Sequence, residues 1–145
     1  MPEGEEVPEI PAGCEAAKPN TIPIRVPEAD FMKLTKIPIL IVYGDNIASE
    51  PSPIYNVNVW RISLTRSRHF AEAVNRRGGD VRVLHLPEIG IKGNTHAAFA
   101  DLNNLEIADV VEKFLAEKKL DGRAHPHTGP APKNLTAYTI PLAAE

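Results

Sequence analysis

The feature that most constrains this chain is an apolar run at residues 37–43, with the sequence IPILIVY, which ends at Gly44. The run is rich in β-branched residues and contains no charged one. A continuous run of this kind is typical of a strand in a parallel sheet that is covered on both faces, because a strand with one face in water alternates apolar and polar residues. The run therefore predicts a buried strand with neighbouring strands on both of its edges.

Three further elements follow this run. Residues 60–77 have an apolar side and an arginine-rich side, which predicts a helix that ends at Gly78 and Gly79. A second apolar run at 81–86 predicts a strand, and 105–118 predict a final amphipathic helix, which Asn103 or Asn104 is expected to cap. The order strand, helix, strand, helix predicts a βαβ unit of two parallel strands with a trailing helix.

Two strands alone cannot bury such a run on both faces, and residues 37–119 are short for an independent α/β core. We therefore expect an α/β module that completes a larger sheet. Residues 1–36 are rich in proline and acidic residues and are predicted to be irregular, with at most a short strand at 21–26. Residues 120–145 have no apolar period and are predicted to form a flexible tail.

Composition excludes several classes of function. The 145 residues suit one domain, and the net charge of −3 argues against the basic surface that nucleic acids require. A single cysteine, Cys14, excludes an internal disulfide framework and a cysteine-based zinc site. No apolar run has the length of a membrane span, and the first ten residues lack the basic start and apolar core of a signal peptide. Neither a cytoplasmic nor a secreted location is excluded.

The loop that follows the second predicted strand, residues 86–97 with the sequence LPEIGIKGNTHA, contains the residue most suited to chemistry. His96 lies beyond the carboxyl end of a parallel strand, where α/β folds gather their active groups. Gly90 and Gly93 allow the loop to turn sharply and to pass close to other backbone. The alternative is a loop histidine that makes a structural hydrogen bond.

Three segments carry a resemblance to a known family: IPILIVYGDN at 37–46, GGDVRVLHLP at 78–87 and GNTH at 93–96. Together they resemble the C-terminal end of an α/β-hydrolase, and in particular an esterase-like branch whose final motif reads Gly-Asn-Ser/Thr-His. The resemblance covers about residues 30–119 and implies a partial α/β-hydrolase fold with a Ser-His-acid triad. It assigns to His96 the role of general base, which takes the proton of the serine hydroxyl and returns it to the leaving alcohol.

The other two members of such a triad are not found at the expected positions. The nucleophile of this fold lies in a G-x-S-x-G elbow that precedes the acid, and none of the four serines has that setting: Ser49, Ser52, Ser63 and Ser67. In many α/β-hydrolases the acid occupies the position of Ile47, which has no carboxylate. Asp45 lies two residues earlier and is interpreted as a turn or capping residue. In the esterase-like branch the acid is a glutamate after the preceding strand, and its possible substitutes are solvated acids near the N-terminus: Glu3, Glu5, Glu6 and Glu9.

Other candidates are interpreted structurally. His85 is expected to be a packed or edge residue of a strand, and His69 to be exposed on the arginine-rich helix face. His125 and His127 lack a third ligand for a metal. Residues 90–93 lack the spacing of a phosphate-binding loop. The helix arginines are interpreted as a solvated face: Arg61, Arg66, Arg68, Arg76 and Arg77. No cofactor and no metal is expected.

Two functional hypotheses follow. In the first, the chain is the C-terminal fragment of a Ser-His-acid carboxylic-ester hydrolase that supplies His96 and is inactive alone, because the nucleophile elbow is absent. Its partner would be the missing N-terminal part of the hydrolase or a complementing chain, and the complete enzyme would cleave a small-molecule ester, with no nucleic-acid or membrane partner. In the second, the chain is a non-catalytic α/β binding module that docks on a partner through its sheet edge. The substrate lies beyond what the sequence shows, because its pockets depend on loops.

Overall fold

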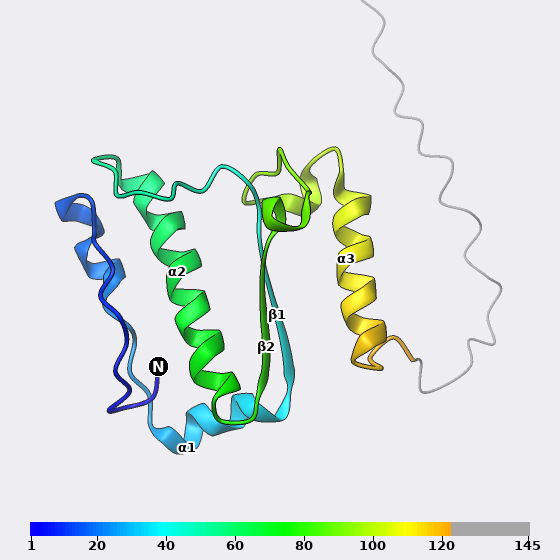
Figure 1. Cartoon of the computed structure of the whole chain (residues 1–145), viewed down its shortest axis with the longest axis horizontal. Coiled ribbons are helices and arrows are strands. Elements are labelled where there is room, and N and C mark those ends of the chain that lie inside the picture. Colours follow the sequence, from blue (N-terminus) through cyan, green and yellow to red (C-terminus); the bar gives the residue numbers. More distant parts are fainter. Residues whose placement is uncertain (123–145) are drawn as a thin grey trace, which may run out of the picture.

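The structure is a computed structural model, and it describes residues 1–122. A two-stranded sheet lies between helix α2 (Tyr55–Asn75) and helix α3 (Asn104–Glu117), and the N-terminal segment lies on the outer side of α2 (Figure 1). This arrangement of helices around a parallel pair of strands confirms the expected partial α/β fold. Residues 123–145, with His125 and His127, lie outside the described part of the chain.

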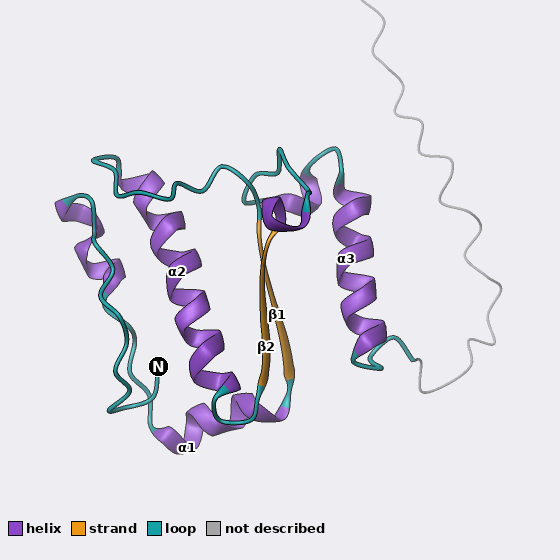
Figure 2. Cartoon of the chain, in the orientation of Figure 1, coloured by secondary structure: helices purple, strands orange, loops and turns teal. Residues whose placement is uncertain are grey.

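The two strands, β1 (Pro38–Tyr43) and β2 (Asp80–His85), pair in parallel from Pro38 opposite Asp80 to Tyr43 opposite His85 (Figure 2). Both strands and their parallel pairing were expected from the two apolar runs. Because the strands are parallel, their carboxyl ends lie at the same edge of the sheet. The loops that follow Tyr43 and His85 therefore meet there.

One face of the sheet packs against α2. Ile39 and Ile41 of β1 point to this face with Val83 of β2, and they contact a buried cluster that includes Phe31 and Val74. Phe31 ends the short helix α1 (Glu28–Phe31), and its ring packs edge-on against that of Phe70 of α2. Alternate residues of each strand thus form the core with α2, as the period of a strand requires.

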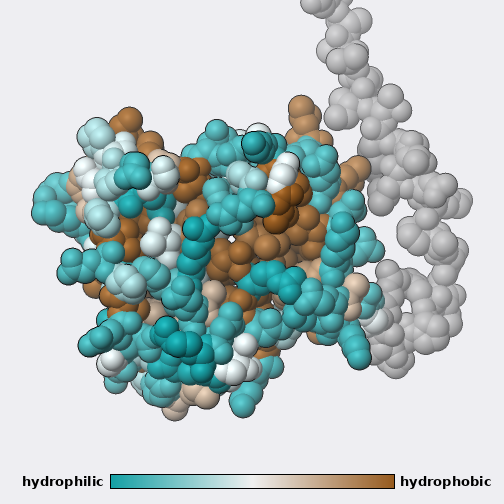
Figure 3. Space-filling model, in the orientation of Figure 1, coloured by the Kyte–Doolittle hydropathy of each residue, from teal (hydrophilic) through white to brown (hydrophobic). Residues whose placement is uncertain are grey.

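The opposite face of the sheet is only partly covered by α3. The ends of α3 and β2 are joined by ion pairs of Arg82 with Glu117 and of Lys118 with Asp80, at 2.6 and 2.8 Å. An open cavity of about 380 Å³, lined in part by Leu84 and Phe114, remains between the helix and the sheet. Figure 3 shows apolar side chains at the surface in this central region.

The expectation that residues 37–43 form a strand buried on both faces is therefore not met in the described chain. Every residue of β1 is partly exposed, because residues 1–122 provide one neighbouring strand and not two. The run therefore has apolar side chains that the described chain buries only in part. The strand pattern fits a larger sheet than the one that residues 1–122 form.

The N-terminal segment is irregular, as expected, but it is held against α2. The short strand considered at 21–26 is reduced to a single bridge between Pro2 and Val26. A 3-10 helix, Glu15–Thr21, precedes this stretch, and its buried Ala17 packs with Ile10 and with Ile62 of α2. Apolar contacts thus fix a stretch of chain whose composition predicts little regular structure.

The interpretation of the helix arginines as a solvated face holds for Arg68 and Arg76, which are exposed, and is wrong for the other three, which are buried or half-buried: Arg61, Arg66 and Arg77. Arg61 is 6% exposed and donates hydrogen bonds to Asn58 and to the backbone oxygen of Pro11. The remaining arginines of the face also have partners: Arg66 binds the backbone oxygen of Thr21, Arg68 pairs with Glu88, Arg76 pairs with Glu5, and Arg77 pairs with Glu5 and Glu28. Most of these partners belong to the N-terminal segment, so the arginines attach that segment to α2.

His69 is likewise not fully exposed. It is half-buried on α2, and its Nδ1 lies 3.2 Å from a guanidinium nitrogen of Arg66. Burial lowers the pKa of His69, and the neighbouring positive charge of Arg66 lowers it further. His69 therefore belongs to the contact between α2 and the N-terminal segment.

Candidate active site at the carboxyl edge of the sheet

At Gly44, directly after β1, the backbone lies in close contact with the loop that follows β2. A Cβ atom at this position would lie 3.0 Å from the backbone oxygen of Asn94 and closer still to that of Thr95. Real Cβ atoms are not found this close to backbone atoms, so only glycine allows the loop of residues 93–96 to pass here. The glycine that ends the first apolar run thus brings the loop that carries His96 against β1.

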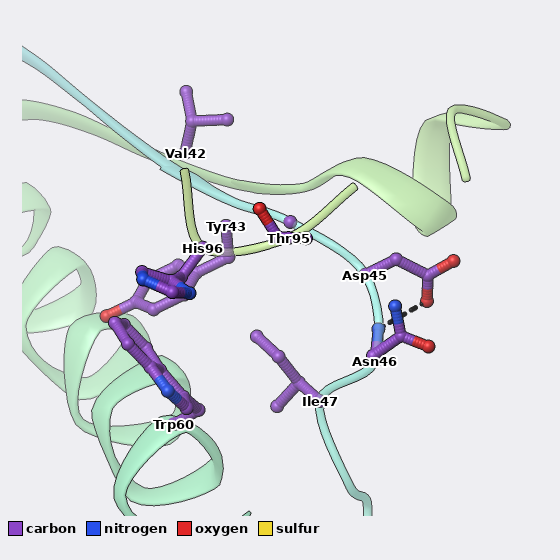
Figure 4. Close-up of a pocket in the computed structure, with 9 residues that line it drawn as sticks. Val42, Tyr43, Asp45, Asn46, Ile47, Trp60, Thr95 and His96 are labelled. Carbon is purple, nitrogen blue, oxygen red and sulfur yellow. Dashed lines mark hydrogen bonds between the residues drawn. The ribbon is translucent and has the colours of Figure 1, made fainter. Parts of the chain in front are cut away.

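Asp45 fastens this contact with three hydrogen bonds. Its backbone N–H donates to the oxygen of Asn94 at 2.9 Å, and its carboxylate accepts from the backbone N–H groups of Gly93 at 2.9 Å and of Asn46 at 2.6 Å. The hydrogen bond from Gly93, followed by that from Asn46, lowers the pKa of Asp45. These bonds fit the interpretation of Asp45 as a turn residue, and Figure 4 shows its carboxylate directed away from His96.

Asn94 anchors the same loop from inside the molecule. Its side chain is fully buried and exchanges two hydrogen bonds with the side-chain amide of Asn103, at 2.6 and 3.1 Å. Asn103 precedes α3 at the capping position, but its side chain makes no capping hydrogen bond. The expected helix cap is therefore wrong, because the Asn103 amide is engaged with Asn94.

Asp101 holds Thr95, which precedes His96, and Thr95 in turn holds Ala97, which follows His96. The backbone N–H of Thr95 donates to Oδ2 of Asp101 at 2.8 Å, and the Thr95 hydroxyl donates to Oδ1 at 3.1 Å. The Thr95 hydroxyl also accepts from the backbone N–H of Ala97 at 3.1 Å. The loop on both sides of His96 is thus held by side chains that follow β1, that belong to the loop itself and that precede α3.

The His96 ring is exposed and stacks on Trp60, which lies in the first turns of α2. The two ring centroids are 5.2 Å apart and the planes differ by 27°. Both rings line a cavity of about 260 Å³ at the carboxyl edge of the sheet, together with Val42 and Ile47 (Figure 4). Within residues 1–122 the imidazole has no hydrogen-bond partner, so its two ring nitrogens are available to other groups.

None of the carboxylates considered as the third member of a triad is bonded to His96 in the described chain. Ile47, at the position of the acid in many α/β-hydrolases, lines the cavity with an apolar side chain. Asp45 is engaged by the backbone. Glu5 pairs with Arg76 and Arg77 at the opposite end of α2, and the remaining N-terminal candidates are exposed: Glu3, Glu6 and Glu9.

The serines have structural surroundings. Ser63 and Ser67 lie on α2, and the Ser67 hydroxyl shares a hydrogen bond of 2.9 Å with the Tyr43 hydroxyl. Ser52 lies in the loop before α2, where its hydroxyl accepts from the backbone N–H of Ile54 at 3.1 Å, and Ser49 is exposed in the same loop. No serine is hydrogen-bonded to His96 in residues 1–122.

The other described histidine near this edge, His85, is the last residue of β2. Its Nδ1 lies 3.5 Å from a carboxylate oxygen of Glu88, which fits the expected edge position. In the described part of the chain, no three histidine, cysteine, aspartate or glutamate side chains gather in a way that could hold a metal ion. No helix among residues 1–122 is both long and apolar enough to cross a membrane.

The sequence pointed to His96 but not to the residues that surround it. Trp60 was interpreted only as part of an apolar helix side, yet it is the one tryptophan of the chain and it stacks on His96. A usable signal was its position, because the helix that follows a parallel strand begins near the carboxyl edge of the sheet. No comparable signal marked Asp101, whose partner is the Thr95 backbone.

Comparisons with known proteins support the resemblance for part of the chain. No family model matches it. A stretch of 48 residues, 33% of this chain and 13% of its relative, is 54% identical to a fungal protein (strain ATCC 74256) named "Probable secreted lipase phiG". A solved structure described as a novel bacterial esterase is 34% identical, with a TM-score of 0.53 over 61% of this chain and 26% of the esterase chain. The chain therefore spans about an eighth and a quarter of the lengths of these two relatives.

Proposed function

Part of this chain is related to esterases and lipases of the α/β-hydrolase type, and on that premise we propose that it is the C-terminal part of a Ser-His-acid carboxylic-ester hydrolase. The observation that carries the proposal is the position of His96. It follows β2 at the carboxyl edge of a parallel sheet, on a loop that is fixed on both sides while the imidazole itself stays accessible. This is where a general base of the fold acts.

In the proposed reaction, His96 accepts the proton of a serine hydroxyl as the serine oxygen attacks the ester carbonyl carbon. The protonated imidazole then gives this proton to the alcohol oxygen as the bond between the carbonyl carbon and that oxygen breaks. A water molecule repeats the two steps on the acyl-enzyme and releases the acid. The serine, the acid that orients His96 and the oxyanion-hole donors come from a part of the enzyme outside this chain.

The open sheet supports the proposal that the rest of the active site belongs to a part of the enzyme outside this chain. β1 and β2 each have one neighbour in residues 1–122, and all residues of β1 remain partly exposed although the run is apolar. The missing N-terminal part of the hydrolase, or a complementing chain, would pair with a free edge and cover these side chains. Without it, His96 has no nucleophile to activate, and the chain alone is inactive.

A chimera tests the proposal directly. Residues 30–122 would replace the matching stretch of the solved bacterial esterase, and hydrolysis of an aryl acetate would be measured. We expect turnover that His96→Ala reduces by about 10⁴-fold or more, because the members of a triad act as a unit. His69→Ala, on α2 and outside the cavity, is the matched control and should leave turnover unchanged. Equal turnover of the His96→Ala and His69→Ala chimeras would refute the role of His96.

The chain by itself provides the second test. The 145-residue protein should show no aryl-ester hydrolysis above the uncatalysed rate. Turnover by the chain alone that disappears in His96→Ala would overturn the claim that the nucleophile lies elsewhere.

The open sheet edge also favours a second candidate function, a non-catalytic α/β module that docks on a partner through that edge. This candidate predicts that the chain binds its partner equally well with and without His96, and that the complex hydrolyses no ester. The chimera separates the two candidates, since a module has no need of an active His96.

A further inference from the structure

The cavity beside His96 has the chemistry of a substrate subsite. Its walls are largely the apolar side chains of Val42, Ile47 and Trp60. Thr95 and His96 line the side that is formed by the loop of residues 93–96. In Figure 4 Ile47 faces the Trp60 and His96 rings across the open space. A group bound there would lie directly against the imidazole that the proposed function uses.

The volume of the cavity limits what can enter. A dry cavity of about 150 Å³ with apolar walls holds one benzene molecule in an engineered protein. The cavity has a volume of about 260 Å³ and therefore suits a single ring with a short substituent, or a short branched chain. The flat wall formed by Trp60 also favours a ring, because aromatic groups pack well in offset or edge-on contact.

The charges around the cavity limit its occupant further. No lysine or arginine is among its described lining residues, so nothing there would balance a carboxylate or phosphate. The one acidic lining residue, Asp45, has its carboxylate occupied by the backbone N–H groups of Gly93 and Asn46 and turned away from His96. It is therefore not placed to bind a cation. An uncharged group enters such a site without an uncompensated desolvation penalty.

We propose that this cavity receives a ring-sized, uncharged group of the ester, and that Ile47 and Trp60 set the size of that group. The substrate class is thus esters with an aryl or short branched group on one side of the ester bond. This inference rests on the proposed function of His96 for its catalytic meaning. The binding site itself can be tested without any turnover.

Binding can be followed through Trp60, because it is the only tryptophan in the chain and lines the cavity. Titration of the 145-residue chain with methyl benzoate should change the tryptophan fluorescence saturably, with a dissociation constant on the order of 1 mM for a ligand of this size. Benzoate, which has the same ring but a negative charge, should bind at least about tenfold more weakly.

Two substitutions test the size limit from opposite directions. Ile47→Phe fills the cavity and should weaken methyl benzoate binding by about tenfold or more, whereas Ile47→Ala enlarges it and should improve binding of the longer butyl benzoate. Ile89→Phe is the control, because Ile89 lines the separate cavity between β2 and α3. Absence of saturable binding, or equal binding by Ile47→Phe and Ile89→Phe, would overturn the subsite.

The chimera separates the failure of this inference from failure of the proposed function. If turnover depends on His96 but Ile47→Phe does not shift the preference between methyl benzoate and methyl acetate, the subsite is wrong and the function stands. If methyl benzoate binds as expected but turnover is the same in His96→Ala, the function is wrong and the binding site stands.

Discussion

At the scale of single residues, the backbone around His96 is held by hydrogen bonds and its ring by stacking. Gly93 is bonded to Asp45, Asn94 to Asn103 and Thr95 to Asp101, while the imidazole stacks on Trp60. The stack opposes rotation of the ring about its Cβ–Cγ bond. The two ring nitrogens have no hydrogen-bond partner within residues 1–122 and stay available to other groups.

The buried amide pair gives the first prediction. Asn94→Ala removes both hydrogen bonds to the half-buried amide of Asn103, and each bond contributes about 0.5–1.5 kcal/mol to the free energy of unfolding. Urea denaturation followed by circular dichroism measures the loss. Asn104→Ala is the matched control, since Asn104 is exposed and makes one long hydrogen bond of 3.4 Å. Equal midpoints for the two variants would contradict a supporting role for Asn94.

The lowered pKa of Asp45 gives a prediction on pH. Because its folded pKa lies below the unfolded value of about 3.9, its contribution is fully present above about pH 4 and is lost as pH falls through the folded pKa. The amide signal of Gly93 in nuclear magnetic resonance spectra should therefore shift in acid, below about pH 4. In Asp45→Asn, which cannot titrate, that shift should disappear. The same titration in both proteins would assign the effect to another group.

The sequence made His96 a candidate but could not describe its surroundings. The position of the histidine after a strand, together with the resemblance carried by the Gly-Asn-Thr-His segment, singled it out. The partners of that segment, Asp45 and Asp101, lie 48 and 6 residues from the atoms they bind, and only the folded chain shows that they point to the loop. A hydrogen bond to backbone leaves no distinct pattern in the sequence.

At the scale of elements, α2 is attached to the N-terminal segment by charged and polar groups as well as by the apolar contacts of Ile62. Glu5 is the centre of this contact, with a 10% exposed side chain between Arg76 and Arg77. The hydrogen bond from Arg77 holds the pKa of Glu5 below its usual range. The sequence showed these charges but not their pairing, because the partners are separated by 71 and 72 residues.

We predict that Glu5→Ala loosens the N-terminal segment. Hydrogen bonds between charged groups contribute about 1.5–3 kcal/mol, and the loss should appear as faster proteolysis within residues 1–20 while α2 and the sheet stay protected. Limited proteolysis with mass spectrometry measures this. Glu6→Ala, at an exposed neighbouring position, should behave like the unmodified chain. If Glu5→Ala and Glu6→Ala are cut at the same rate, the arginine contact does not hold the segment.

At the scale of the whole molecule, the dominant feature is a two-stranded sheet that leaves the apolar side chains of β1 partly exposed in the described chain. The bounds of β1, β2 and α3 agree with the sequence prediction within one residue, because apolar period and flanking glycine and proline define them. Helix α2 begins at Tyr55 rather than at residue 60, and its first turn contains the buried Asn58, whose side chain donates to the Ile54 oxygen at 3.1 Å. Such local polar contacts lie outside what periodicity detects.

The open sheet predicts self-association of the isolated chain. Light scattering should detect species larger than a monomer at concentrations of about 100 µM, because unpaired strand edges join readily. Leu40→Lys, which places a charge on β1, should reduce this association. Leu102→Lys is the control, since Leu102 is fully exposed outside the strands. A strictly monomeric chain at this concentration would show that its edges are already protected.

The close contact at Gly44 also bears on how a divided enzyme would assemble. All of the groups seen to hold the His96 loop, from Asp45 to Asn103, belong to this chain. The conformational entropy of ordering that loop is therefore lost when the chain folds, and not when a partner arrives. The measured affinity for the partner would then reflect the docked sheet edge and the apolar side chains that it covers, and a histidine already in place would shorten the delay between docking and the first turnover.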